Sequence, residues 1–209
     1  TKRLRFGSAA VTALTLATVL SGALVAGNDA GRAINTWPRM HLEGVDYWIP
    51  PGSILWELEP WTRNLLETTA TVQFNHRLLG TATAVSALTV AGAGLAATRG
   101  ASVLTPQVQK GLMALGLAAT GQFALGVSTL LYYVPLSLAA THQLGSVVVF
   151  TSGIYLTHAL RYSAVPAVVQ KGSTALAAAA APRIATAATR SMSTAAAAKN
   201  LLSAPKVLK

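Results

Sequence analysis

The sequence predicts an all-α integral membrane protein: a four-transmembrane antiparallel helix bundle with an amphipathic, Trp-rich cap loop between the first and second spans. Of its 209 residues, 52% are hydrophobic and 11% are charged, which is too apolar for an ordinary soluble domain. The apolar residues come in blocks of about twenty without strand-like alternation, and this pattern favours helices over a transmembrane barrel. The net charge of +10 comes from basic residues scattered over loops and tail with no aromatic platform between them, so it indicates membrane topology and no nucleic-acid binding.

The hydropathy pattern divides the chain into a membrane domain over residues 1–162 and a basic Ala-rich tail over residues 163–209. Gly22 and Gly27, at the end of the first span, are available for close helix contact. The tail holds basic residues and no acid; we expect a disordered or interfacial segment, with a docking helix for a partner as the alternative. The expected spans are residues 8–27, 66–97, 111–133 and 136–160.

The connection between the first two spans has a different composition from the rest of the chain. All six acidic residues and all four tryptophans lie between residues 28 and 67. Tryptophan prefers the headgroup level of a membrane, so we expect this cap to lie along one membrane face. Its prolines break it into short pieces, with short helices expected over residues 55–58 and 61–66.

The distribution of Lys and Arg predicts the orientation of the spans. Basic residues occur before the first span, in the loop between Arg99 and Lys110, and after the fourth span. The acidic cap and the short turn at Tyr132–Pro135 would then lie on the opposite side. This is the positive-inside pattern with both termini inside.

Two histidines stand out because each lies within an apolar span. His76 is preceded by Gln73 and followed by Arg77, and an ionisable side chain at this depth is a functional hypothesis by default. His76 lies nine residues beyond Glu67, about 14 Å along a helix, and His142 lies seven residues beyond Pro135, about 10 Å. Two side chains that enter from the same membrane face at similar depths can meet across a bundle.

Each of these histidines has a glycine about one turn away on its own helix. Gly80 follows His76 by four residues and Gly145 follows His142 by three, which would leave a flat space for a porphyrin. These features predict one haem with His76 and His142 as axial ligands of its iron. Copper or zinc would require a third ligand, and no other histidine or carboxylate is expected at that depth. A hydrogen-bonded interhelical role for His76 is the alternative.

The other two histidines are not predicted to bind the haem iron, and two arginines are candidates for contacts with the haem propionates. His158 is expected at the inner end of the fourth span and His41 in the cap, so neither is a predicted ligand. Arg77 and Arg63 could pair with haem propionates that face the outer water. For Arg77 the alternatives are snorkelling to the interface or pairing with an acid. The chain has no cysteine, which excludes iron–sulfur and zinc–cysteine sites within it.

Several motifs resemble the haem A synthase family of cytochrome oxidase assembly enzymes. They occur in the family's order and with similar spacing, and the resemblance covers roughly residues 4–161. The motifs are Ser21–Gly27, Asp29–Gly31, Asn35–Pro38, Trp48–Pro50, Glu59–Trp61 with Arg63 and Asn64, Val72–Arg77, and the stretch from Leu131 and Tyr132 to His142 and Gln143.

The resemblance implies a fold, a reaction and a set of partners. Family members have eight spans in two four-helix halves, and this chain is similar to the second half, which holds a b-type haem. In the first half a glutamate lies three residues before the histidine; Gln73 has that position here and cannot act as an acid or base. No catalytic residue is therefore expected in this chain. The implied reaction is oxidation of the haem O methyl group to the formyl group of haem A.

The implied partners are a separate or missing N-terminal catalytic half, a redox donor such as a ferredoxin, respiratory complex subunits and membrane lipids. The implied location is the mitochondrial inner membrane with both termini on the matrix side, and a bacterial inner membrane is the alternative.

The residues and the resemblance together predict two alternative functions. In the first, the chain is the b-haem-carrying half of a haem A synthase and works with a partner half. In the second, it is a non-catalytic haem-binding subunit with a structural or electron-transfer role in a respiratory complex. A small transporter or channel is less favoured, because few polar groups are expected to face the bundle and no broken helix is evident.

Overall fold

The computed structural model describes residues 2–98 and 104–162 as one compact unit. The tail predicted over residues 163–209 and the middle of the loop after residue 98 lie outside the described residues. The long helices are α1 (Lys2–Gly27), α4 (Thr69–Thr98), α5 (Pro106–Leu131) and α6 (Leu136–Tyr162). The connection from α1 to α4 contains α2 (Ala30–Ala33), β1 (Met40–Leu42), β2 (Val45–Tyr47), α3 (Gly52–Leu55) and the 3₁₀ helix η1 (Trp61–Leu65).

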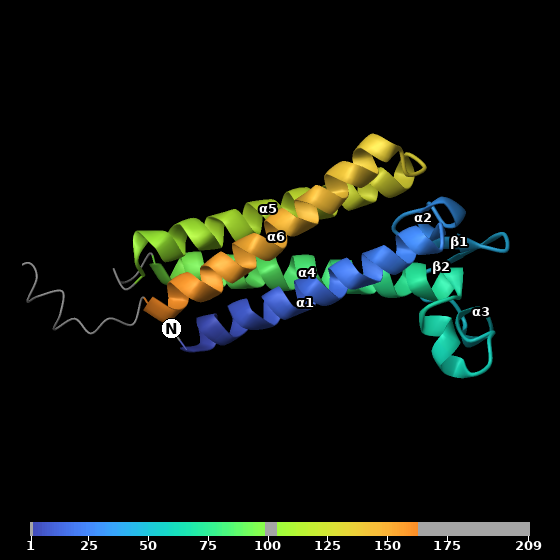
Figure 1. The fold of residues 1–209 in the computed structure, drawn as a ribbon, viewed down its shortest axis with the longest axis horizontal. Helices are drawn as coiled ribbons and strands as arrows, with labels where there is room; N and C mark the ends of the chain where they lie inside the picture. The colour runs from blue at the N-terminus through green and yellow to red at the C-terminus, as the bar shows by residue number, and fades with distance from the viewer. Residues whose placement is uncertain (1, 99–103, 163–209) are drawn as a thin grey trace, which may run out of the picture. The chain divides into compact units, whose positions relative to one another are not determined.

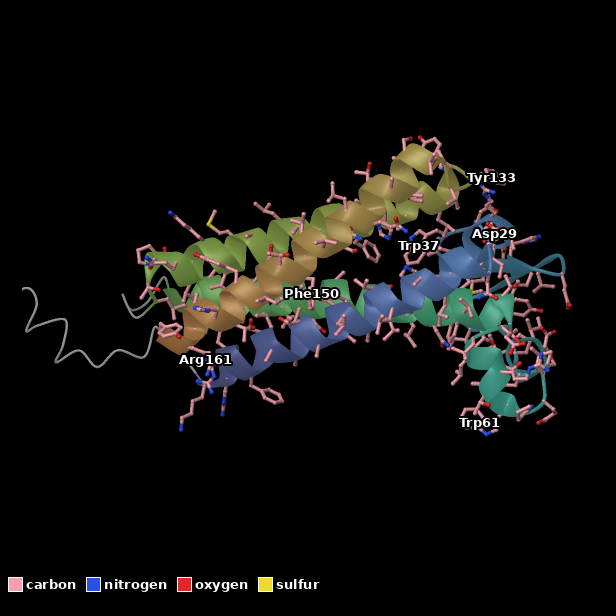
Figure 2. All side chains as sticks on the ribbon, viewed as in Figure 1. Asp29, Trp37, Trp61, Tyr133, Phe150 and Arg161 are labelled. Carbon is pink, nitrogen blue, oxygen red and sulfur yellow. The ribbon has the colours of Figure 1, made fainter. Side chains whose placement is uncertain are left out.

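The four long helices form an antiparallel bundle in which α1 packs against α4 and α6, and α5 packs against α4 and α6 (Figure 1). The start of α1 and Arg161 of α6 lie at one end of this bundle (Figure 2). Asp29, Trp61 and the turn at Tyr133 lie at the other end (Figure 2). The short elements between α1 and α4 therefore form a cap at the end where α5 turns into α6.

Three of the helices, α1, α4 and α5, are long and apolar enough to cross a membrane, by length and composition. The fourth, α6, has 27 residues but does not reach the same apolarity. The mostly helical fold with these three candidate spans fits the predicted all-α membrane class.

The core of the bundle lies at the end remote from the cap. Leu112, Leu115 and Leu156 are fully buried there, together with Val11 and Leu160. Small residues allow the helices to approach: a Cβ at Gly94 would lie 2.7 Å from Leu112 Cδ1. This tightly packed end holds the four helices together and leaves the space between them at the cap end.

The largest differences between the helix boundaries and the predicted spans are at the starts of α1 and α5. Helix α1 begins at Lys2 rather than at residue 8, because long basic side chains continue a helix while their charges reach water. Helix α5 begins at Pro106 rather than at residue 111. Thr105 is its N-cap and Pro106 its first residue, a start signal that the hydropathy pattern alone does not contain.

The cap contains a β-hairpin that the all-α prediction did not include. Strands β1 and β2 pair antiparallel, with His41 opposite Asp46. The two turn residues, Glu43 and Gly44, both have positive φ, at 51° and 79°. A two-residue turn of this kind matches the twist of the strands, and glycine favours it.

Of the two short helices expected in the cap, one forms and one does not. The segment 61–65 is the 3₁₀ helix η1, close to the expected range 61–66. The prediction of a helix over residues 55–58 is wrong, because α3 ends at Leu55. The Leu55 carbonyl instead accepts a hydrogen bond from Thr71 Oγ1 at 2.5 Å, which ties the cap to the start of α4.

Candidate functional site

A cavity of about 500 Å³ lies between the four long helices in the half of the bundle next to the cap. All four helices contribute to its wall, and cap residues from Asp29 to Trp37 contribute as well. His76 from α4 and His142 from α6 both line this cavity, although 66 positions separate them in the chain. Helices α4 and α6 both begin at the cap end of the bundle and run away from it, which brings together the two histidines selected from the sequence.

His76 packs against the neighbouring helix α1. A Cβ at Gly22 would lie 3.0 Å from His76 Cε1, so the missing side chain of Gly22 makes room for the imidazole. Nδ1 of His76 lies 2.8 Å from Ser21 Oγ, also on α1. The ring is therefore held against α1 by one hydrogen bond and one close contact.

His142 has the same kind of contact with its own neighbour, α5. A Cβ at Gly126 would lie 2.7 Å from His142 Cε1, which is closer than real Cβ contacts come. Gln122, one turn before Gly126, donates from Nε2 to the His142 carbonyl at 2.9 Å. Each histidine thus packs against a glycine of the adjacent helix, and sequence reasoning did not pair these glycines with the histidines. The separations of 54 and 16 positions carry no local spacing signal.

The two glycines predicted on the histidines' own helices have different surroundings. Gly80 lines the cavity, and a Cβ there would meet no atom within 4 Å. Gly145 is not among the cavity-lining residues; a Cβ there would collide with Gln122 Oε1. The flat space expected at Gly145 is absent because the Gln122 side chain fills it.

Arg77 lines the cavity and is held by the cap. It donates from Nη1 to the Thr36 carbonyl at 3.0 Å and from Nη2 to the Pro38 carbonyl. Its guanidinium lies 4.9 Å from the centroid of the Trp37 ring, a cation–π distance. Trp37 in turn contacts Phe123 of α5 edge to face at 5.7 Å, so one aromatic side chain links the cap to the far wall of the cavity. Figure 2 shows Trp37 between the two helix pairs.

Arg63 does not line the cavity. It forms an exposed ion pair with Glu67 at 2.6 Å, four residues further along. The hydrogen bond between them raises the pKa of Arg63 and lowers the pKa of the Glu67 carboxyl. Arg32 of α2, which the sequence reasoning missed, does line the cavity and has an exposed side chain.

Gln73 lies in the cavity wall and is buried, with 2% of its surface exposed. Its Nε2 donates to the Ile34 carbonyl at 3.1 Å, while its Oε1 has no hydrogen-bond partner. Asp29 is the one carboxylate among the described cavity-lining residues, and it belongs to the cap.

The other two histidines lie outside the cavity wall. His41 pairs with Asp46 across the hairpin at 2.9 Å, and His158 stacks on Tyr162 at 4.9 Å between ring centroids. Within residues 2–98 and 104–162, no group of three or more His, Asp or Glu side chains could hold a metal ion.

These residues fit a flat, mostly apolar group with a metal at its centre. Two imidazoles from different helices face one cavity, whose volume is in the range of about 300–1,000 Å³ of cofactor sites. Open space at Gly80 and two arginines at the cap side, Arg32 and Arg77, match a porphyrin face and its carboxylates.

The comparisons with known proteins place the chain in a family. Residues 1–154 match the family model COX15-CtaA, described as cytochrome oxidase assembly protein. The chain belongs to the cytochrome oxidase assembly protein family. This match covers every residue of the cavity wall, so the cavity belongs to the family region of the chain.

Relatives of this chain occur in plants, bacteria and animals. Over 145 residues the chain is 46% identical to Heme A synthase COX15 of Arabidopsis thaliana, covering 69% of this chain and 29% of that protein. It is 42% identical over 152 residues to Heme A synthase of Rhodopseudomonas palustris strain BisA53, covering 73% and 39%. It is 40% identical over 160 residues to Heme A synthase COX15 of Homo sapiens, covering 77% and 36%.

The chain therefore spans between 29% and 39% of the length of these three relatives. No solved structure matches the chain.

Proposed function

We propose that this chain is a haem-binding membrane protein of haem A biosynthesis and cytochrome c oxidase assembly, and that it is the b-haem-carrying half of a haem A synthase. His76 and His142 would hold the iron of one haem b. The observation that carries this proposal is that the two histidines, far apart in sequence, line one cavity together. The names of the relatives, all heme A synthases, support the pathway.

The cavity wall supports specific roles for its residues. His76 and His142 would hold the haem iron, and the open space at Gly80 would accommodate the porphyrin. Arg77 and Arg32 would contact the propionates, in place of Arg63, whose guanidinium is engaged by Glu67. A haem bound in this way supplies one-electron transfer. The protein's own contribution is to fix the imidazoles and exclude water with the Trp37 and Phe123 side chains.

The proposed enzyme requires more than this chain. Gln73 offers an amide where a glutamate would be needed for catalysis, so oxidation of haem O would take place on a separate N-terminal half. Such a half, together with a redox donor such as a ferredoxin, completes the proposed oxidoreductase. The alternative function, a non-catalytic structural or electron-transfer subunit in contact with respiratory complex subunits, is favoured by the same observation at Gln73.

The proposed location is the mitochondrial inner membrane, where α1, α4, α5 and α6 cross the lipid bilayer as four spans. Both termini then lie on the matrix side, and the cap with its exposed Trp48, Trp56 and Trp61 lies at the opposite headgroup level. The acidic residues of the cap and the basic start of α1 support this orientation.

Histidine substitutions test the proposed ligands. We expect His76→Ala or His142→Ala to remove the bound haem, because one remaining imidazole does not hold the iron on both sides. His41→Ala and His158→Ala are the matched controls outside the cavity and should retain it. The measurement is the haem-to-protein ratio after purification in detergent, and full haem content in both cavity variants would refute the assignment.

A further inference from the structure

The hydrogen bonds around His76 determine which of its ring nitrogens carries the proton. Ser21 Oγ lies 2.7 Å from the Thr18 carbonyl oxygen and 2.8 Å from His76 Nδ1. A carbonyl oxygen only accepts, and a serine hydroxyl has a single hydrogen to donate. If that hydrogen goes to the Thr18 carbonyl, Nδ1 of His76 must be the N–H donor to Ser21 Oγ.

The partner of Nδ1, Ser21 Oγ, lies on α1, and the contact with Gly22 keeps the ring against that helix. Nε2 has no hydrogen-bond partner in residues 2–98 and 104–162, and the ring lines the cavity. With the proton on Nδ1, Nε2 has a free lone pair.

His142 provides an internal comparison, because it packs against Gly126 as His76 packs against Gly22. The residue before Gly22 is Ser21, whereas the residue before Gly126 is Leu125, which has no hydroxyl. The buried Nδ1 of His142 has no hydrogen-bond partner in the described structure. The two histidines therefore have equivalent packing and unequal hydrogen bonding.

We propose that Ser21 is a positioning residue that holds His76 in the Nδ1–H tautomer and thereby presents Nε2 to a metal centre in the cavity. The inference rests on the proposed haem function for its consequence, although the tautomer itself does not require haem. A hydrogen bond from the outer ring nitrogen orients a ligating imidazole and increases its electron donation to the metal. His76 would accordingly be the more strongly donating and more rigid of the two histidine ligands.

The first test reads the tautomer without haem. The full chain is labelled with ¹⁵N-histidine, prepared in detergent without haem, and the His76 signals are assigned by their loss in His76→Gln. We expect a protonated Nδ1 and an unprotonated Nε2 in the unmodified chain, and a smaller fraction of this tautomer in Ser21→Ala. A protonated Nε2 in the unmodified chain would overturn the proposal.

The second test reads the metal. Ser21→Ala should weaken haem affinity about tenfold, the lower end of the range for lost outer hydrogen bonds, and should raise the midpoint potential because the imidazole donates less. Ser21→Thr retains a hydroxyl and should restore both values. Ser8→Ala is the matched control: Ser8 also lies on α1 and bonds across the bundle, to Thr157 at 2.8 Å, but neither residue lines the cavity.

The outcomes separate the two claims. A Ser21→Ala variant that matches Ser8→Ala in haem affinity and potential would overturn the positioning role. If the chain binds no haem, yet Nδ1–H is found and is reduced in Ser21→Ala, the tautomer assignment stands and the proposed haem function fails.

Discussion

Single residues in the cavity are held by contacts between adjacent helices rather than within one helix. His76 depends on Gly22 and Ser21 of α1, and His142 depends on Gly126 and Gln122 of α5. Glycine is required at these positions because a Cβ would occupy the space of an imidazole carbon. The geometry of the site is therefore sensitive to small changes on α1 and α5, which carry neither histidine.

A methyl group added at Gly126 tests this dependence. The Cβ in Gly126→Ala would lie 2.7 Å from His142 Cε1, so the imidazole must move away from its present position. We expect haem affinity to fall about tenfold or more, as for a displaced ligand. Gly121→Ala is the matched control on the same helix, because a Cβ at Gly121 meets no atom within 4 Å. Equal haem affinities of the two variants, measured by haem titration, would contradict the contact.

Restoring an acid at residue 73 tests the catalytic assignment. We expect Gln73→Glu alone to produce no haem A from haem O, because one carboxylate does not supply the missing half. The substitution also removes the donor to the Ile34 carbonyl, so cap attachment should weaken. Extracted haems are identified by chromatography and mass spectrometry after incubation with haem O and a reductant. Haem A in that extract would overturn the half-enzyme proposal.

The hairpin of the cap and the start of α5 follow rules of turn and helix-capping chemistry that hydropathy does not record. The hairpin turn at Glu43 and Gly44 and the start of α5 at Thr105 and Pro106 are both local signals present in the sequence. The prediction by apolar blocks located all four long helices but displaced the starts of α1 and α5.

The ion pair between Arg63 and Glu67, at the junction of η1 and α4, makes a pH-dependent contribution to stability. The hydrogen bond from Arg63 lowers the pKa of Glu67, so the folded chain holds this carboxylate charged at pH values where an unfolded chain begins to protonate it. The stabilising contribution is present above the ordinary carboxyl pKa and is lost as pH falls through the lowered value. It should be small, because both side chains are exposed to solvent.

A titration of Glu67 followed by ¹³C NMR measures this directly. We expect Arg63→Gln to raise the Glu67 pKa towards its ordinary value, since the main cause of the shift is the Arg63 hydrogen bond. An unchanged pKa in Arg63→Gln would show that the ion pair is not populated in solution.

Packing of the long helices depends on the core remote from the cap. Leu112 is fully buried between α4 and α5, so Leu112→Ala should lower the free energy of unfolding by about 2–5 kcal/mol. Leu117 on the same helix is 73% exposed in the structure. Leu117→Ala should therefore change the free energy of unfolding by less than about 0.5 kcal/mol. Unfolding in a mixed-detergent titration distinguishes the two. Similar losses in both variants would refute the proposed core.

At the scale of the whole molecule, the orientation in the membrane determines which side the cap and the cavity face. Helix α6 is less apolar than the other three long helices, yet the four-span proposal requires it to cross the bilayer. The chain contains no cysteine, so single cysteines can report the side of each end without background.

We expect Lys2→Cys and Arg161→Cys to react with an impermeant thiol reagent from one side of the membrane. Trp48→Cys and Tyr133→Cys should react from the other side, because the cap and the α5–α6 turn share one end of the bundle (Figures 1 and 2). Labelling of Arg161→Cys and Tyr133→Cys from the same side would exclude α6 as a span.

The mostly helical membrane class and the shared cavity of His76 and His142 could be read from the sequence, because apolar block length and helical rise determine depth in a bundle. The glycines of neighbouring helices could not be paired with the histidines, since that pairing depends on helix rotation, which block length does not specify. For the same reason, the sequence did not indicate that Arg32 lines the cavity. The open space predicted next to Gly145 is filled by the Gln122 side chain.

The central claim is that this four-helix chain binds one haem b between His76 and His142. The most direct measurement is a reduced-minus-oxidised optical spectrum of the purified chain in detergent, combined with pyridine haemochrome analysis of the extracted haem. We predict a low-spin b-type spectrum with about one haem per chain. A purified, folded chain without haem, or with a high-spin haem that retains only one imidazole, would contradict the claim.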